Sequence, residues 1–344
     1  MTTGTVRIDR VADGVWIIAP ENAPSVLDDA AGIDVTVLEV LGGHLSWSVF
    51  AEYTVPVAVI DDVVSAQNWV WAVFGEEVAL AVAEGETGSE VTVEPARPRV
   101  AVGARRLAFA HWAARWWPTS TVDAIPALDA GLLNREIATL VEDCDLLVDG
   151  DDALAPEGPT LSDRPGRADD YALAAGAATA TRPGTLVLKR GITGSDWRRY
   201  PPGLVDCSER AVSWEVVRTS GNTAVRVSIV AAPYVSEPVP DHVRPRALIG
   251  TASGAVDVAL RLSGDVWFGE SAAPPGAEAG VSVDVYLPGF GVNGVADVGG
   301  SDARERVRAL ARLRLRRAAE PTPDDGPDAP LLAEIDAAAS DSDF

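Results

Sequence analysis

Apolar and polar residues alternate along several short stretches in the first hundred residues. These stretches are rich in β-branched residues and are bounded by Gly, Pro or Asp, which predicts β-strands. The predicted strands span residues 35–40, 47–53, 55–60 and 90–95. The stretch 66–83 between them is almost continuously apolar, so it fits either a buried pair of strands or a helix.

Helical spacing replaces this alternation from residue 105 onward. In the segment 105–118, Phe109, Trp112 and Trp116 recur at i, i+3 and i+7, and Trp117 lies beside this stripe. From Leu133 to Cys144 the apolar residues again recur at helical spacing, with polar residues on the opposite side. The first 150 residues are therefore expected to form one mixed domain of strands and helices.

The tryptophan stripe has two interpretations. Aromatic residues at helical spacing usually pack into a core, here against the N-terminal sheet. The alternative is a protein interface, since aromatic residues are enriched there. Trp112, Trp116 and Trp117 are kept as candidate interaction residues under the second interpretation.

The second half of the chain has a different pattern. Residues 151–168 are rich in Gly, Pro, Asp and Ser without an apolar period, which predicts a linker. Alternation with a period of two then extends from Thr185 to about residue 290, and two hairpins are predicted, at 211–230 and 255–269. One polar face per strand predicts an antiparallel, sandwich-like domain over 169–300.

The C-terminal part divides into two charged segments. Residues 301–318 are expected to form a basic helix with Ser301 as N-cap. Residues 319–344 contain acidic but no basic side chains, and we expect them to form a disordered acidic tail. The predicted class is therefore α+β, with a mixed N-terminal domain, a β-sandwich-like C-terminal domain, a basic helix and a tail.

Bulk composition narrows the possible functions. The chain has 344 residues, of which 47% are hydrophobic, and a formal net charge of -23. This charge disfavours nucleic acid and anionic membranes as partners of the whole molecule. No apolar stretch is clean and long enough for a membrane span, and the start lacks the pattern of a signal peptide. A cytoplasmic location is expected, and the scarcity of lysine is typical of a GC-rich, actinobacterial-like composition.

Motifs for catalysis or cofactor binding are weak. His44 lies near Ser46 and Ser48, which permits a nucleophile-base arrangement, although a lone histidine is more often structural. Three scattered histidines and two distant cysteines form no metal-binding motif. The lone lysine, Lys189, precedes its glycines, which is the reverse of a phosphate loop. We therefore predict no cofactor and no metal.

The basic helix is the most unusual charge feature. Between residues 304 and 317, seven arginines accompany only one glutamate, Glu305. Such a helix can dock on acidic surface of its own chain or of a protein partner, or it can bind nucleic acid. We favour docking on protein, and the candidate interaction residues are Arg312, Arg314, Arg316 and Arg317.

The leading hypothesis is a non-enzymatic adaptor or structural component of a cytosolic bacterial multiprotein assembly, with protein partners. One alternative is a hydrolase of unfamiliar type that uses His44 with a nearby Ser or Asp. The other is a nucleic-acid-associated regulator that acts through the arginine-rich C-terminal helix. No nucleic-acid or membrane partner is expected under the leading hypothesis.

Overall fold

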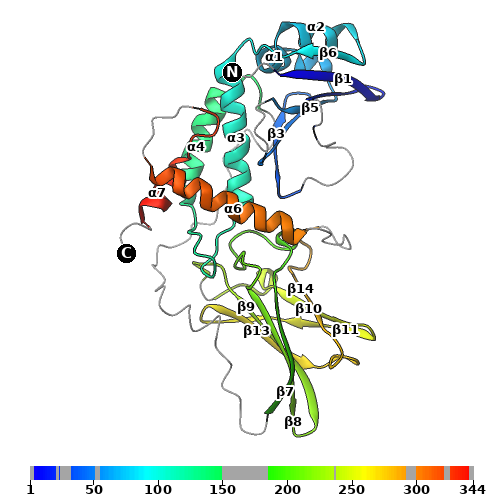
Figure 1. The fold of residues 1–344 in the computed structure, drawn as a ribbon, viewed down its shortest axis with the longest axis vertical. Coiled ribbons are helices and arrows are strands. Elements are labelled where there is room, and N and C mark those ends of the chain that lie inside the picture. Colours follow the sequence, from blue (N-terminus) through cyan, green and yellow to red (C-terminus); the bar gives the residue numbers. More distant parts are fainter. Residues whose placement is uncertain are drawn as a thin grey trace. The chain divides into compact units, whose positions relative to one another are not determined.

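The computed structural model confirms the predicted α+β class (Figure 1). It describes residues 4–20, 23, 32–50, 55–148, 185–235, 238–291, 300–320 and 326–340. The predicted linker 151–168 lies outside the described residues. Contacts divide the chain into two compact units that are discontinuous in sequence. Unit 1 comprises residues 1–115, 128–159 and 313–344, and unit 2 comprises residues 116–127 and 160–312.

Unit 1 contains a six-stranded antiparallel sheet of order β3-β4-β5-β2-β1-β6. Its strands are β1 (Thr5–Ala12), β2 (Val15–Pro20), β3 (Val35–Val40), β4 (Gly43–Ser48), β5 (Val57–Ile60) and β6 (Ser89–Thr92). The predictions for β3, β5 and β6 agree with the structure to within a few residues. The predicted strand 47–53 overlaps only the end of β4, which begins earlier, at Gly43, and pairs along its length with β3. Residues 51–53 of that prediction lie outside the described residues.

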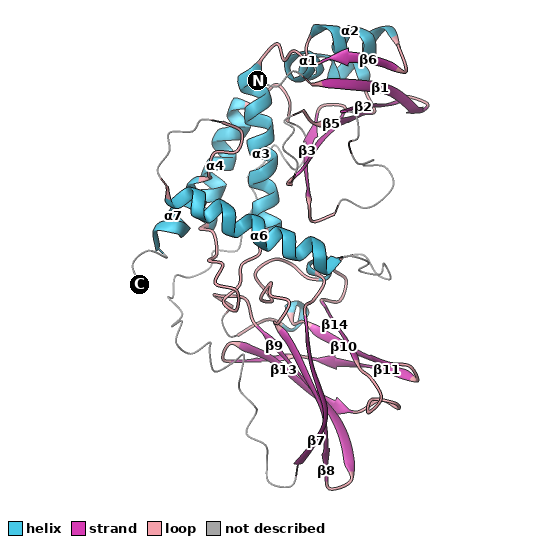
Figure 2. Ribbon diagram, in the orientation of Figure 1, coloured by secondary structure: helices cyan, strands magenta, loops and turns pink. Residues whose placement is uncertain are grey.

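Helices cover this sheet (Figure 2). The ambiguous stretch forms α1 (Val63–Phe74) and α2 (Glu76–Glu84). Gly75 separates them with φ of 103°, and a Cβ there would lie 2.3 Å from the main-chain oxygen of Glu94. Only glycine fits this sharp turn. Trp69 of α1 is fully buried and donates its indole hydrogen bond to the main-chain oxygen of Leu41 at 2.7 Å.

Two further helices complete the N-terminal part. The tryptophan segment forms α3 (Pro98–Trp116), which begins earlier than predicted and ends before Pro118. The second predicted helix is α4 (Ala130–Asp143), with Asp129 as its N-cap. Leu107 of α3 and Ile137 of α4 are fully buried. No helix among the described residues combines the length and apolar character needed to cross a membrane.

Unit 2 contains two antiparallel sheets. The five-stranded sheet has the order β12-β13-β9-β8-β7 and the three-stranded sheet the order β11-β10-β14. Their strands are β7 (Thr185–Thr193), β8 (Val212–Thr219), β9 (Asn222–Val230), β10 (Arg246–Thr251), β11 (Gly254–Ala259), β12 (Arg261–Ser263), β13 (Val266–Ala272) and β14 (Ser282–Tyr286). Short 3-10 helices lie at Trp197–Arg199 and Asp241–Val243. The sheets approach closely at Gly269, whose missing side chain would meet Val258 and Leu260 at 2.8 Å.

The first predicted hairpin is confirmed as β8 and β9. Ser220 and Gly221 connect the strands with φ of 49° and 84°, and the flanking Thr219 and Asn222 are paired. Positive φ at both turn residues matches the twist of an antiparallel hairpin. The second predicted hairpin is confirmed at its Ser-Gly-Asp turn, where β12 pairs with β13. Its first arm is wrong, because the continuous stretch breaks at the fully buried Leu260. Strand β11 pairs with β10 in one sheet, whereas β12 pairs with β13 in the other.

The C-terminal region is more ordered than its composition suggests. The basic helix is confirmed as α6 (Gly300–Ala319), whose residues up to Arg312 belong to unit 2 and the rest to unit 1. The prediction of a disordered tail is wrong for residues 332–340, which form α7 (Leu332–Ser340). Composition did not predict this helix, because its buried face consists mainly of alanine. Residues 321–325 and 341–344 lie outside the described residues.

Candidate functional site

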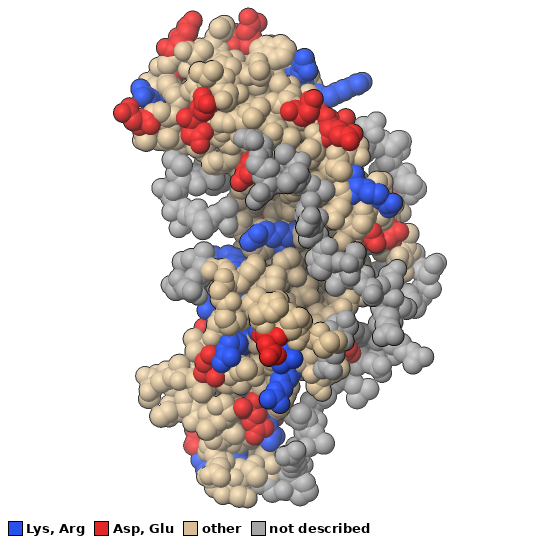
Figure 3. Space-filling model, turned by 180° about the vertical axis from the view of Figure 1, so that it is seen from behind, with Lys and Arg blue, Asp and Glu red and all other residues tan. Residues whose placement is uncertain are grey.

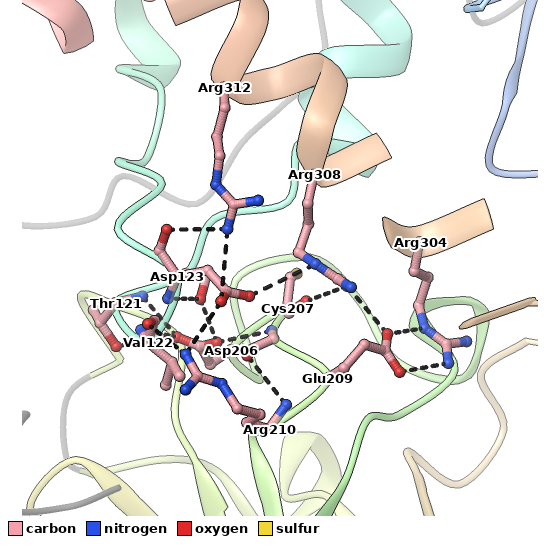
Figure 4. A network of polar contacts seen from close by, with 12 residues as sticks. Thr121, Val122, Asp123, Asp206, Cys207, Glu209, Arg210, Arg304, Arg308 and Arg312 are labelled. Atoms are coloured by element: carbon pink, nitrogen blue, oxygen red, sulfur yellow. Dashed lines mark hydrogen bonds and ion pairs between the residues drawn. The ribbon is translucent and has the colours of Figure 1, made fainter. Parts of the chain in front are cut away.

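The arginines of α6 line one helical stripe in unit 2. Arg304, Arg308 and Arg312 are spaced by four residues, so they lie on the same side of the helix. Arg304 and Arg308 are each only 5% exposed. Buried guanidinium groups require charged or strongly polar partners. The structure supplies these partners from two loops of unit 2 (Figure 4).

Glu209 is the first of these partners. Its carboxylate accepts hydrogen bonds from Arg304 at 2.6 and 3.1 Å and from Arg308 at 3.1 Å. Arg308 also donates to the main-chain oxygen of Cys207 at 3.2 Å. The bidentate geometry between Arg304 and Glu209 is the strong form of an arginine-carboxylate pair. One carboxylate therefore holds two successive turns of α6.

Asp123 is the second partner. Its carboxylate lies 3.6 Å from both Arg308 and Arg312, and its main-chain oxygen accepts a hydrogen bond from Arg312 at 3.3 Å. Arg210 approaches the same carboxylate at 3.4 Å. Asp123 belongs to the segment 116–127, which separates α3 from α4 in the sequence but lies in unit 2. The stripe therefore connects α6 to this segment and to the loop 204–210.

Asp206 links the same two loops from within. Its side chain accepts hydrogen bonds from the hydroxyl of Ser120 at 2.7 Å, from the main-chain and hydroxyl groups of Thr121 at 2.7 and 3.0 Å, and from the main chain of Ser208 at 2.9 Å. The residue is fully buried. Burial raises the pKa of Asp206 above its ordinary value, and these hydrogen bonds offset only part of the rise.

A second set of arginines forms ion pairs within unit 1. Arg314 of α6 makes a bidentate pair with Glu334 of α7, at 2.6 and 2.7 Å, and Glu334 is fully buried. The guanidinium of Arg314 also lies 4.0 Å from the ring centroid of Phe109, within cation-π range. Arg106 of α3 pairs with Glu136 of α4. These contacts join α3, α4, α6 and α7.

The candidate arginines thus differ in environment. Arg312 and Arg314 pair with carboxylates of their own chain. Arg316 and Arg317 are exposed. On the face shown in Figure 3, basic and acidic side chains are interspersed, without a large continuous basic field. The arrangement neutralises most of the stripe internally, which is the intramolecular version of the docking predicted from the sequence.

The candidate tryptophans are largely internal. Trp112 is 4% exposed, donates a hydrogen bond to the main-chain oxygen of Ile33 at 2.7 Å and stacks on Phe109 at 5.2 Å. Trp117 is 7% exposed and donates to the main-chain oxygen of Pro126 at 2.9 Å. Trp116 is half-buried. Trp112, Arg316 and Arg317 belong to unit 1, whereas Trp116 and Trp117 belong to unit 2.

His44 lies on β4, opposite Glu39 of β3 and Val59 of β5. Burial lowers the pKa of His44, and the nearby Asp61 and Glu39 oppose this shift. The charged groups near the imidazole are therefore the carboxylates of Asp61 and Glu39. The hydrolase alternative still needs a nucleophile, and it stays a prediction.

Other candidate chemistry has structural explanations. Asp62 caps α1, accepting hydrogen bonds from the main chains of Val64 and Ser65 at 3.0 and 3.3 Å. Burial raises the pKa of the Cys144 thiol to about 12, and it raises that of Cys207 still further, so neither thiol ionises near neutral pH. Among the described residues, no group of three His, Cys, Asp or Glu side chains is placed to hold a metal ion.

Strand β7 has three exposed apolar side chains, and our sequence analysis did not single it out. It forms one edge of the five-stranded sheet, and within the described residues its free side pairs with no strand. Leu186 and Ile192 are 60% and 63% exposed, and Val187 is 39% exposed. The sequence signal for this strand is an apolar run around the lone Lys189, but period alone cannot show which strand forms an edge.

The chain matches no protein-family model, no curated protein and no solved structure.

Proposed function

We propose that this protein is a non-enzymatic, cytoplasmic adaptor of a multiprotein assembly, and that it binds an extended segment of a partner protein along strand β7. The observation that carries the proposal is the nine-residue edge strand with its exposed apolar side chains. An unpaired edge offers main-chain donors and acceptors to an added strand. Exposed apolar residues supply the burial that makes such pairing stable.

The chemistry of β7 favours a foreign strand over a second copy. Lys189 stands at the centre of the strand, where its ammonium group donates a hydrogen bond to the main-chain oxygen of Ala279 at 2.5 Å, and the exposed Arg190 follows it. Antiparallel pairing of β7 with itself about this centre places like charges opposite each other, which is destabilising. A partner segment with apolar residues on both sides of an Asp or Glu complements the strand instead. We therefore infer an extended, apolar segment with a central carboxylate.

The arginine helix supports a protein partner more than a nucleic acid. Arg304, Arg308 and Arg314 are already paired with carboxylates of the chain, so few of their donors remain for phosphate groups. The net charge of -23 adds long-range repulsion of a polyanion. The nucleic-acid alternative would depend on the exposed arginines of α6, which are Arg306, Arg316 and Arg317.

The proposal is tested by charging the edge strand. The variant with Leu186→Lys and Ile192→Lys places two ammonium groups where apolar partner atoms would pack. A specific partner is first captured by the tagged full chain in its native cells and purified. Its Kd for the variant, measured by biolayer interferometry, is expected to rise at least about tenfold, because burying each uncompensated charge costs more than 1 kcal/mol.

Leu80→Lys is the matched control, since Leu80 is 52% exposed on α2 of unit 1. This variant should bind the partner with a Kd within about twofold of the parent. Far-UV circular dichroism should show that both variants are folded. A parent chain that captures no specific partner contradicts the proposal. So does a partner that binds the β7 variant and the parent equally well.

A further inference from the structure

The segment 326–340 packs against helices of its own unit as a bound peptide would. We call it the C-terminal segment, and we call the four residues that hold it the docking surface. The docking surface consists of Arg105, Arg106, Glu136 and Arg314, from helices α3, α4 and α6. All of these residues, and the whole C-terminal segment, belong to unit 1.

The docking surface recognises the main chain of the segment. Arg106 donates to the main-chain oxygens of Ala329 at 3.3 Å and Pro330 at 3.0 Å. Arg314 also donates to the oxygen of Ala329, at 3.2 Å. Glu136 accepts a hydrogen bond from the main-chain nitrogen of Leu332 at 2.7 Å. Side chains that read successive main-chain groups fix the path of the segment independently of its sequence.

Carboxylates at two positions add sequence preference. Arg314 holds Glu334, which is fully buried and also accepts a hydrogen bond from the main-chain nitrogen of Leu331 at 2.7 Å. Arg105 pairs with Asp328 at 2.9 Å. A second nitrogen of Arg105, Nη1, is buried and has no hydrogen-bond partner within the described residues. The surface thus selects a carboxylate at two positions that lie six residues apart.

The apolar part of the interface is compact. Ala329, Leu331 and Ala333 are at most 5% exposed, whereas Leu332 and Ile335 are 51% and 44% exposed. Helix α7 has nine residues, which is too short for a stable isolated helix in water. The segment therefore gains its structure on the surface. Its determinants lie within residues 328–334, so a short linear peptide contains them.

We propose that the docking surface is a peptide-binding site whose ligand is the C-terminal segment, and that it accepts this segment from a second copy of the chain as well as from its own. Exchange of an identical element needs no new contacts, because each copy supplies the same residues 328–334. Residues 321–325 connect the segment to the end of α6. Such a short tether gives the resident segment an effective concentration on the order of millimolar. An untethered segment therefore competes poorly until the resident one is cut free.

The test uses the full chain with residues 321–325 replaced by a specific protease site. After cleavage, the C-terminal piece should co-elute with the rest of the protein in gel filtration at micromolar concentration. A fluorescein-labelled 326–340 peptide, which represents the segment of a second copy, should then bind the cleaved protein. Its anisotropy should give a Kd in the micromolar range, and binding to the uncut protein should be at least about a hundredfold weaker.

Matched variants distinguish specific recognition of the peptide from nonspecific binding. A Glu334→Gln peptide should bind at least about tenfold more weakly, because the charge-assisted pair with Arg314 is lost. An Asp336→Asn peptide should bind within about twofold, because Asp336 is exposed. On the protein, Arg314→Gln should weaken binding and the exposed Arg316→Gln should not. The peptide variants leave the protein unchanged, so they remain decisive if Arg314→Gln does not fold.

Two results would overturn the proposal. One is release of the cleaved piece without any binding of the labelled peptide below millimolar concentration. The other is equal binding of the Glu334→Gln and parent peptides.

Discussion

Asp206 shows how one buried carboxylate can organise two loops. Its two oxygens accept hydrogen bonds from the main-chain nitrogens of Thr121 and Ser208, one each. The hydroxyl of Ser120 adds a third donor at 2.7 Å. Sequence alone offered no sign of this role, because Asp206 lies far along the chain from residues 120 and 121. The local sequence shows only that residue 206 is polar. Its burial and its hydrogen bonds depend on residues that are distant in the sequence.

Asp206→Asn tests this arrangement. In either orientation the amide nitrogen of asparagine would face a main-chain N–H donor, so one buried group would lose its acceptor. We expect the free energy of unfolding to fall by about 1–3 kcal/mol in urea denaturation. Asp265→Asn, at an exposed position of the same unit, should change it by less than about 0.5 kcal/mol. Equal stabilities of the parent and Asp206→Asn would contradict the role.

The difference in unfolding free energy between the parent and Asp206→Asn should depend on pH, and the raised pKa of Asp206 fixes its sign. Burial raises the pKa of Asp206 in the folded state, so the folded protein retains a proton that the unfolded chain releases at about pH 4. Stability from this group is therefore present below pH 4 and is lost as the pH rises through the raised folded value. The stability difference between the parent and Asp206→Asn should shrink across that interval. A difference that grows with pH would contradict the raised pKa.

At the scale of elements, helix α7 separates what composition can predict from what it cannot. The periods of β3, β8, β9 and α4 are strong, and their predicted types are confirmed. Helix α7 was missed because its buried face is made of small residues and one glutamate. Only the arginines of other helices make burial of that glutamate favourable. The break at Leu260 was missed for a similar reason, since alternation does not show which sheet a strand joins.

Removal of residues 321–344 is expected to lower the thermal midpoint by several degrees. Truncation exposes the apolar contacts of Leu331 and leaves Arg314 without its carboxylate, a loss of a few kcal/mol. Removal of residues 341–344 alone should leave the midpoint within about one degree. Differential scanning calorimetry measures both variants. An unchanged midpoint after the longer deletion would show that the segment contributes nothing to stability.

For the whole molecule, the decisive feature is that its units are discontinuous in sequence. Residues 116–127 belong to the β-rich unit, and residues from 313 onward belong to the N-terminal unit. Local patterns cannot predict such assignments, because they depend on contacts between distant segments. The arginine stripe was predicted to dock on acidic protein surface, but the identity of its carboxylates, Glu209 and Asp123, emerges only from the fold. The edge position of β7 is likewise a property of the complete sheet.

The central claim is that β7 receives a strand from another protein, and site-specific photo-crosslinking in the native cells tests it most directly. A photoreactive phenylalanine analogue is placed at Ile192 in one strain and at Leu80 in another. We predict that residue 192 crosslinks to one specific protein, through a segment that mass spectrometry identifies as extended and apolar with a central Asp or Glu. Residue 80 should not crosslink to that protein. The claim is contradicted if residue 192 gives no specific crosslink, or if its crosslinks lead only to nucleic acid or to other copies of this chain.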